Sequence, residues 1–167
     1  MPPRPVALLL LLCAAVLAGG AASAAALDRD DTLRRINAMR AAGAQCGSQW
    51  SPPAPPLRWD DALERAAAVQ ARDMAVRDLV AHDGSDGSDV GERAERQGYR
   101  WSDAAQNAAA GRADAPTTLA QWLASPSHCE NLMDPEFRDV GVATEYRAGT
   151  RYRWFWVMVL GRRMAGP

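Results

Sequence analysis

Apolar side chains recur at helical spacing through most of the chain and change to alternate positions near its end. Leu33, Ile36 and Met39 lie three residues apart, which predicts a first helix that Asp30 and Asp31 can cap. Such a helix buries its apolar stripe against a neighbouring layer of structure.

A second amphipathic pattern predicts the longest helix, from its N-cap Asp60 to about Val80. The polar residues 81–88 are rich in Gly, Ser and Asp, so we expect a turn-rich segment there. A short helix is expected over about 89–97, because Gly98 suits the position just beyond a helix end.

The middle of the chain gives weaker signals. The proline-rich residues 46–57 predict an ordered loop, and residues 99–101 predict the start of a short strand. Pro116 at a first helical position predicts another helix, which residues 125–129 interrupt before one further turn at 130–133.

Near its end the chain alternates between apolar and other residues, as strands do. Val140, Val142 and Thr144 alternate, a turn is expected at 148–150, and a second strand follows over 151–160. One face of that second strand carries Tyr152, Trp154, Trp156, Met158 and Leu160. Helices followed by an antiparallel hairpin predict an α+β domain whose helices cover the sheet.

Residues 1–24 have the composition of a secretory signal peptide. A segment with one charge precedes the apolar run Val6–Leu17, and small residues lead up to Ala24. We expect cleavage after Ala24 and a single domain over residues 25–167. A retained anchor is the rival interpretation because residues 6–26 carry no charge, but their second half is rich in Ala, Gly and Ser.

The three cysteines become a pair once the leader is removed. Cys13 lies in the leader, and Cys46 and Cys129 remain, 83 residues apart. Disulfides persist in oxidising compartments, so we expect these two to be bonded, with buried free thiols as the alternative. A loop of that length would stabilise the fold by roughly 4 to 5 kcal/mol in the loop-entropy model.

Charge and composition exclude two classes of protein. The 19 basic and 20 acidic side chains give a formal net charge of -1, which argues against binding nucleic acid through a basic surface. An apolar fraction of 48% and six Trp argue against a disordered chain. We expect no stable membrane insertion once the leader is cleaved.

His82 and His128 are the only two histidines, and each is expected in a polar turn directly after a helix. A histidine there is often a cation near the helix dipole, but small polar neighbours also suit a side chain displayed at a cleft. Ser85 and Ser127 lie near them in sequence, which does not place them near in space, so a serine-hydrolase triad is not indicated. No metalloprotease, Cys-x-x-Cys or phosphate-loop motif is present.

Six segments nevertheless occur in an order typical of one family. They are Leu57-Arg58-Trp59-Asp60, Ala81-His82-Asp83-Gly84-Ser85-Asp86-Gly87, Gly98-Tyr99, Ala105-Gln106-Asn107-Ala108-Ala109-Ala110-Gly111, Trp122 with Ser125-Pro126-Ser127-His128, and Phe137 to Val142. With them the chain resembles the CAP superfamily of cysteine-rich secretory, antigen 5 and pathogenesis-related 1 proteins, and most closely its bacterial SCP-like extracellular branch. The resemblance covers about residues 30–161.

This resemblance implies a three-layer α-β-α sandwich around a central, mainly antiparallel sheet, and a secreted or periplasmic location. It also implies a cleft where two histidines and two acidic residues hold a divalent metal, often zinc. By position, the two histidines are His82 and His128. Gln106 replaces the Glu of a Gly-Glu-Asn-Ile-Ala stretch, and Ser125 stands where the second acid follows the helix Trp by three places.

The amide at Gln106 changes the expected chemistry. It keeps the shape and one acceptor of a carboxylate but carries no charge and cannot take a proton at neutral pH. Two neutral imidazoles then lack the third protein ligand that a catalytic zinc usually has. Unless Asp83, Asp86 or Glu130 replaces the missing acid, we expect His82 and His128 to bind a divalent metal only weakly.

Three functions remain open on these grounds. The first is a non-enzymatic module that binds an unidentified ligand or protein partner through its cleft. The second is a metal-assisted hydrolase, such as a peptidase, which needs a carboxylate near a histidine. The third is lipid or sterol binding, which the family resemblance also implies and which needs an apolar groove.

Overall fold

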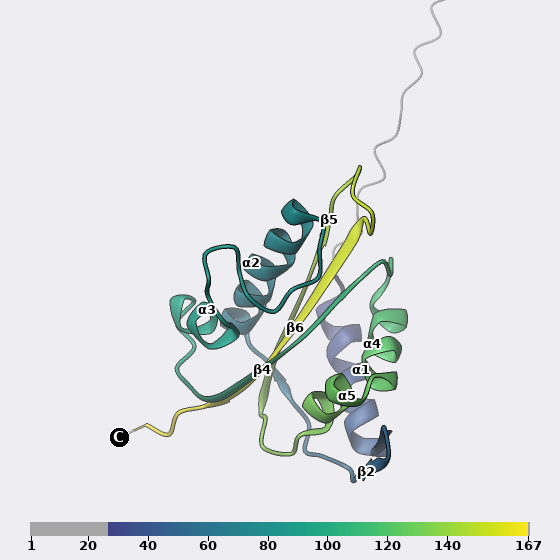
Figure 1. The fold of residues 1–167 in the computed structure, drawn as a ribbon. Helices are drawn as coiled ribbons and strands as arrows, with labels where there is room; N and C mark the ends of the chain where they lie inside the picture. Colours follow the sequence, from purple (N-terminus) through teal and green to yellow (C-terminus); the bar gives the residue numbers. More distant parts are fainter. Residues whose placement is uncertain (1–26, 167) are drawn as a thin grey trace, which may run out of the picture.

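The computed structural model describes residues 27–166, so the expected signal peptide over residues 1–24, including Cys13, lies outside the described residues. Over this range the chain forms five helices and six strands (Figure 1). In chain order they are α1 (Arg29–Ala42), β1 (Ala44–Cys46), β2 (Gln49–Ser51), β3 (Arg58–Trp59), α2 (Asp61–Arg77), α3 (Val90–Arg96), β4 (Trp101–Ala110), α4 (Ala115–Ala124), α5 (Pro126–Met133), β5 (Asp139–Tyr146) and β6 (Trp154–Arg163).

The central sheet has the strand order β3-β5-β6-β4. β6 pairs antiparallel with both β5 and β4, and the two-residue β3 runs parallel to β5. β6 is buried from Phe155 to Gly161, as expected for an inner strand with helices on both faces. β4 forms one edge of the sheet. The prediction of a mainly antiparallel sheet is confirmed.

Alternate residues of β6 face opposite helical layers. One set packs in a core with α2 and α3, and the other packs in a core with α1, α4 and α5 (Figure 1). The two sets are Phe155, Val157 and Val159, and Trp156, Met158 and Leu160. The alternation predicted from the sequence therefore builds the expected three-layer α-β-α sandwich.

Aspartate side chains cap the N-termini of four of the five helices, α1 to α4. Asp60 caps α2 as predicted, accepting hydrogen bonds from the N–H groups of Ala62 at 2.9 Å and Leu63 at 3.1 Å. α1 is capped by Asp28 rather than by the two acids that follow it, because the N–H of Asp31 itself donates to Asp28.

Helix α2 lies directly on strand β5 at Gly141. A Cβ atom added to Gly141 would stand 2.0 Å from the backbone nitrogen of Glu64 and 2.4 Å from the carbonyl carbon of Leu63. Only a residue without a side chain allows this close approach of helix to sheet.

Three sequence-based predictions about strands need correction. β1 and β2 pair as an antiparallel hairpin within the segment 46–57 and just before it, where the sequence predicts a loop. β4 runs through Ala110, whereas the sequence predicts only the start of a strand at 99–101. β6 begins at Trp154, because Arg153 turns the chain with a φ of 65°.

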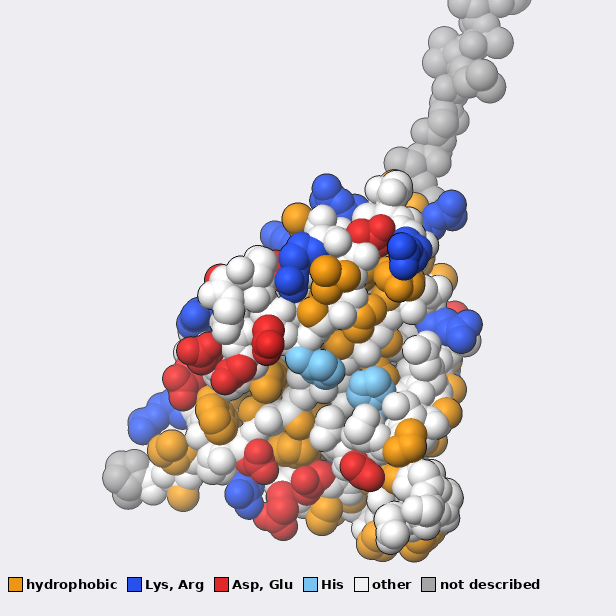
Figure 2. Space-filling model, in the orientation of Figure 1, with side chains coloured by type: hydrophobic (Ala, Val, Ile, Leu, Met, Phe, Trp, Pro, Cys, Tyr) orange, Lys and Arg blue, Asp and Glu red, His pale blue; other side chains and the backbone are white. Residues whose placement is uncertain are grey.

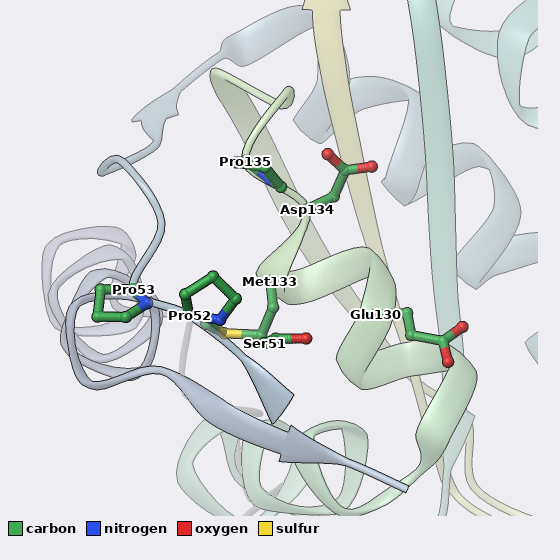
Figure 3. Close-up of a pocket in the computed structure, with 7 residues that line it drawn as sticks. All are labelled: Ser51, Pro52, Pro53, Glu130, Met133, Asp134 and Pro135. Carbon is green, nitrogen blue, oxygen red and sulfur yellow. The ribbon is translucent and has the colours of Figure 1, made fainter. Parts of the chain in front are cut away.

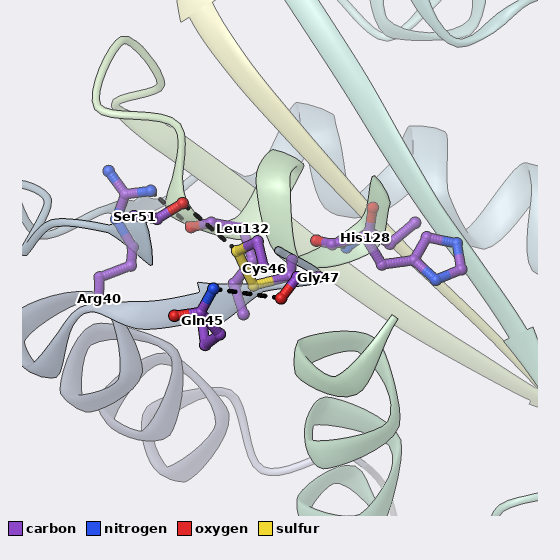
Figure 4. The surroundings of a disulfide bond; sticks show 9 residues. Arg40, Gln45, Cys46, Gly47, Ser51, His128 and Leu132 are labelled. Atoms are coloured by element: carbon purple, nitrogen blue, oxygen red, sulfur yellow. Dashed lines mark hydrogen bonds between the residues drawn. A yellow bond between two sulfur atoms is a disulfide. The ribbon is translucent and has the colours of Figure 1, made fainter. Parts of the chain in front are cut away.

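The expected disulfide joins Cys46 in β1 to Cys129 in α5, with Cα atoms 5.3 Å apart (Figure 4). Both cysteines are buried in a small core with Ala44 and Met133. The bond ties the hairpin that follows α1 to the helix that carries His128.

Arg40 is a fully buried cation near this disulfide (Figure 4). Its guanidinium donates hydrogen bonds to the carbonyl oxygens of Pro55 at 2.8 Å, Leu132 at 2.6 Å and Asp134 at 3.0 Å. Burial lowers the pKa of Arg40 to about 10, which leaves the side chain charged at neutral pH. These bonds hold the proline-rich loop against the end of α5.

Candidate functional site

The site lies at edge strand β4, which carries Gln106 and Asn107 on opposite faces of the sheet. Gln106 is 5% exposed and points to the same side as Ala108, which packs with α2 and α3. Asn107 is fully buried and contacts α5 on the other side. The strand therefore presents polar groups to both helical layers.

His82 lies in the polar segment between α2 and α3, and its side chain is exposed. The Gln70 amide of α2 donates hydrogen bonds to the carbonyl oxygens of Ala81 at 2.9 Å and Asp83 at 3.3 Å. The Arg93 guanidinium of α3 donates to the carbonyl oxygen of His82 at 2.8 Å. Both flanking helices thus hold the backbone that carries this histidine.

His128 lies within helix α5, so its sequence-based placement in a turn is wrong. α4 ends at Ala124, and Pro126 starts α5 after the single residue Ser125, which caps both helices. The side chain of Asn107 donates to the carbonyl oxygen of His128 at 2.9 Å, and Asn131 donates to Asn107 at 2.9 Å. The half-buried histidine is therefore positioned by β4 as well as by its own helix.

The two histidines lie near each other on one face of the molecule (Figure 2). Burial lowers the pKa of His128 below its ordinary 6.5, and the charge that His82 acquires on protonation lowers it further. Hydrophobic side chains lie above the pair in Figure 2, and acidic side chains lie to its left and below it.

The lowered pKa of His128 predicts a pH-dependent contribution to stability. The unfolded chain takes up a proton at an ordinary pKa of 6.5, whereas folded His128 takes it up only at lower pH. This contribution is fully present above pH 6.5 and is lost as the pH falls towards the folded pKa. An NMR titration of the two imidazole rings measures the pKa directly, and His82→Ala should raise the pKa of His128. A wild-type His128 titrating at or above pH 6.5 contradicts the prediction.

Gln106 lies within hydrogen-bond distance of a histidine side chain. Its amide nitrogen Nε2 lies 3.3 Å from Nδ1 of His82, and its oxygen Oε1 accepts a hydrogen bond from Nη2 of Arg93 at 2.7 Å. The position that the family resemblance assigns to an acid therefore holds a neutral amide between an imidazole and a guanidinium.

The three acids that could have replaced the missing carboxylate, Asp83, Asp86 and Glu130, form no hydrogen bond or ion pair with a histidine within residues 27–166. Asp86 accepts hydrogen bonds from Ser88 and Arg96, each at 2.6 Å, and these bonds hold the pKa of Asp86 well below its usual range. In the described part of the chain no group of three or more His, Cys, Asp or Glu side chains could hold a metal ion.

Glu130 instead lines a separate pocket of about 320 Å³ at the end of α5 (Figure 3). The other lining residues are Ser51, Pro52, Pro53, Met133, Asp134 and Pro135. Neither histidine is among them, so this pocket is not part of the histidine site.

Ser125, the expected counterpart of the second acid, lies at the junction of α4 and α5. Its N–H donates to the carbonyl oxygen of Trp122 at 3.1 Å, and its own carbonyl oxygen accepts from the N–H of Cys129 at 2.8 Å. Among the described residues no hydrogen bond joins the hydroxyl of Ser125, Ser85 or Ser127 to a histidine, so the geometry gives no support to a serine nucleophile.

Sequence reasoning missed Arg93 and Asn107, which hold the two sides of the site. Arg93 is 2% exposed although it lies in a short helix rich in charged residues. Its four-residue spacing from Asp89 is typical of an exposed helical ion pair, so the local pattern gave no sign of its burial.

Comparison with known proteins places this architecture in a family. The family model described as "Cysteine-rich secretory protein family" (CAP) matches residues 33–160. No curated protein matches the chain. Within residues 27–166 no helix has both the length and the apolar character needed to cross a membrane.

Several solved structures have a similar fold. An extracellular protein containing an SCP domain from Bacillus anthracis has a TM-score of 0.62 at 23% identity, covering 80% of this chain and 41% of that one. An outer surface protein from Borrelia burgdorferi has a TM-score of 0.64 at 18% identity, covering 85% and 100%. A cysteine-rich secretory protein from Staphylococcus aureus has a TM-score of 0.55 at 16% identity, covering 80% and 38%.

The chain thus spans about two fifths of the Bacillus and Staphylococcus proteins, and at these identities the likeness concerns the fold alone. The family model, in contrast, covers most of residues 27–166, including both histidines, Gln106 and the disulfide. The chain therefore belongs to the cysteine-rich secretory protein (CAP) family.

Proposed function

We propose that this CAP protein is a secreted, non-enzymatic binding module whose cleft at His82 and His128 binds its ligand without a tightly held metal. The observation that carries the proposal is the contact between Gln106 and His82 at 3.3 Å, in the place where the family resemblance expects a carboxylate. An amide in this position supplies neither a metal ligand of high affinity nor a general base.

The donor set fits a tightly bound divalent metal poorly. Zinc in catalytic sites usually takes three protein ligands, and the histidine site offers two imidazoles, one of them already hydrogen-bonded through Nδ1. Carboxylates compensate the charge of a metal, and in residues 27–166 no carboxylate joins the two histidines in a group of three possible metal ligands. Weak, water-completed binding of zinc by His82 and His128 is the most that this set supports.

A metal-assisted hydrolase is the less favoured alternative, because it needs a carboxylate paired with a histidine, and no carboxylate in residues 27–166 forms a hydrogen bond or ion pair with either one. Lipid or sterol binding has one feature in its favour, a pocket of about 200 Å³ whose lining includes Leu27, Trp154 and Trp156. Asp28 and Asp114 also line this pocket, and carboxylates suit an acyl chain or a sterol poorly.

Secretion is part of the proposal. The composition of residues 1–24 supports a cleaved signal peptide, and the Cys46–Cys129 disulfide is typical of an oxidising compartment. The names of the similar bacterial proteins, which include an extracellular and an outer surface protein, agree with export to the periplasm or the medium.

Calorimetric titration with zinc chloride tests the proposed function. We expect the wild-type protein to bind zinc no more tightly than in the micromolar range, and His82→Ala or His128→Ala to weaken the binding further, because each removes one of two imidazole ligands. Ser127→Ala is a matched control, since Ser127 is exposed beside His128 and should leave the titration unchanged. Nanomolar zinc binding, or zinc-dependent cleavage of casein lost in both histidine variants, contradicts the proposal.

A further inference from the structure

A buried cation lies next to His82 and Gln106. Arg93 is 2% exposed, and its guanidinium donates to the carbonyl oxygens of Ser88 and His82 and to Oε1 of Gln106. Three polar groups of the site thus converge on one side chain that does not reach the surface.

These contacts fix the orientation of the Gln106 amide. A guanidinium has five donors and no acceptor, so the group of Gln106 that faces Arg93 must be the oxygen. The amide nitrogen then faces Nδ1 of His82, and an amide NH₂ can only donate.

The series of hydrogen bonds from Arg93 through Gln106 ends on the imidazole of His82. Nδ1 of His82 must accept the hydrogen bond from Gln106, so the single proton of the neutral ring lies on Nε2. The other ring nitrogen of His82, Nε2, is therefore an N–H donor and lacks the free lone pair that a metal ion requires.

We propose that Arg93 is a positioning residue that acts through Gln106 to hold His82 in its Nε2–H tautomer and so weakens metal binding in this cleft. The inference rests on the proposed function, because it explains why a family site built for a metal would bind a ligand without one. It also means that metal binding is weak because of the buried side chain of Arg93, in addition to the missing acid at position 106.

Moving the proton to Nδ1 creates a conflict elsewhere. The Nδ1–H of His82 would face the amide N–H of Gln106, and turning the amide would face that N–H to Arg93. The first arrangement sets two donors against each other in a partly buried place, and the second does so in a fully buried one. A carboxylate at position 106 has no such conflict, because its two oxygens accept from both neighbours and leave Nε2 free.

The experiment is an NMR measurement of the two histidine rings in the metal-free protein, labelled with ¹⁵N in the imidazoles. At about pH 8, where ordinary imidazoles are neutral, long-range ¹H–¹⁵N correlations show which ring nitrogen carries the proton. We expect His82 to carry its proton on Nε2 in the wild-type protein. Gln106→Glu is expected to move the proton to Nδ1. His82→Ala assigns the two rings.

Two substitutions of Arg93 distinguish a role in positioning Gln106 from a role in packing alone. Arg93→Lys keeps a side chain that only donates, so His82 should keep the Nε2–H tautomer. Arg93→Gln can accept as well as donate, so it should release the amide and give a mixture of tautomers. If neither Arg93 variant folds, Gln106→Glu still tests the inference, because it leaves Arg93 in place.

Zinc titration of the same proteins completes the test. Gln106→Glu is expected to raise zinc affinity by about 10- to 100-fold, the range typical of groups that orient a metal-binding histidine. A wild-type His82 with its proton on Nδ1 overturns the inference and leaves the proposed function standing. A tautomer that moves as expected in Gln106→Glu without a gain in affinity also overturns it. Nanomolar zinc binding by the wild type contradicts the proposed function.

Discussion

Replacing both bonded cysteines by serine, Cys46→Ser with Cys129→Ser, is expected to lower the free energy of unfolding by roughly 4 to 5 kcal/mol. The disulfide closes a loop of 83 residues, and opening it increases the conformational freedom of the unfolded chain. The two sulfurs also lie in a buried apolar core with Ala44 and Met133, where a serine hydroxyl is unfavourable. Urea denaturation of the oxidised protein and of the variant measures the difference.

The same variant tests whether the disulfide positions the site. Cys129 directly follows His128, so loss of the bond should broaden the motion of that histidine as seen in ¹⁵N relaxation of its ring. Wild-type protein treated with a reductant is the matched control and should behave like the double variant. A loss of stability below about 1 kcal/mol with unchanged motion of His128 contradicts this account.

Gly141→Ala is expected to destabilise the fold by about 3 kcal/mol or more. The added methyl group would lie 2.0 Å from the backbone nitrogen of Glu64, so it must push helix α2 away from strand β5. The backbone of α2 cannot move aside at low cost, as the end of a flexible side chain can. The contact supports α2, and His82 lies in the segment that follows this helix.

Gly166→Ala is the control for this substitution, because nothing lies within 4 Å of a Cβ added at that position. Its effect should stay within about 0.5 kcal/mol, the range of ordinary surface changes. Thermal unfolding followed by circular dichroism measures both variants. Equal melting temperatures for Gly141→Ala and the wild type would show that α2 does not rest on β5 as described.

The parts of the fold that were predictable from sequence have strong local patterns. The alternation of apolar residues in β6 predicts its two buried faces, and Asp60 predicts the start of α2. Both predictions depend only on residues close in sequence. β4 was harder because Ala104–Ala110 is rich in alanine, which has a low preference for strands, and its pairing partner β6 lies about 50 residues away in sequence. Ser125-Pro126 was interpreted as an interruption, although proline also begins the next helix.

The site was predictable to a similar extent. The Cys46–Cys129 pairing followed from assigning the third cysteine to a leader, and the amide at Gln106 followed from the family resemblance. The role proposed for Arg93 depends on a buried contact between a helix and an edge strand. Such a contact has no signature in the local spacing of charged residues.

The most direct test of the central claim, that this cleft is not a tight metal site, is a crystal structure of the wild-type protein grown with zinc chloride at a small molar excess. The account predicts that Gln106 keeps its contacts with Arg93 and with Nδ1 of His82, and that no zinc ion bridges His82 and His128. An ordered zinc ion bound by both histidines, with an acidic side chain as third ligand, would contradict it.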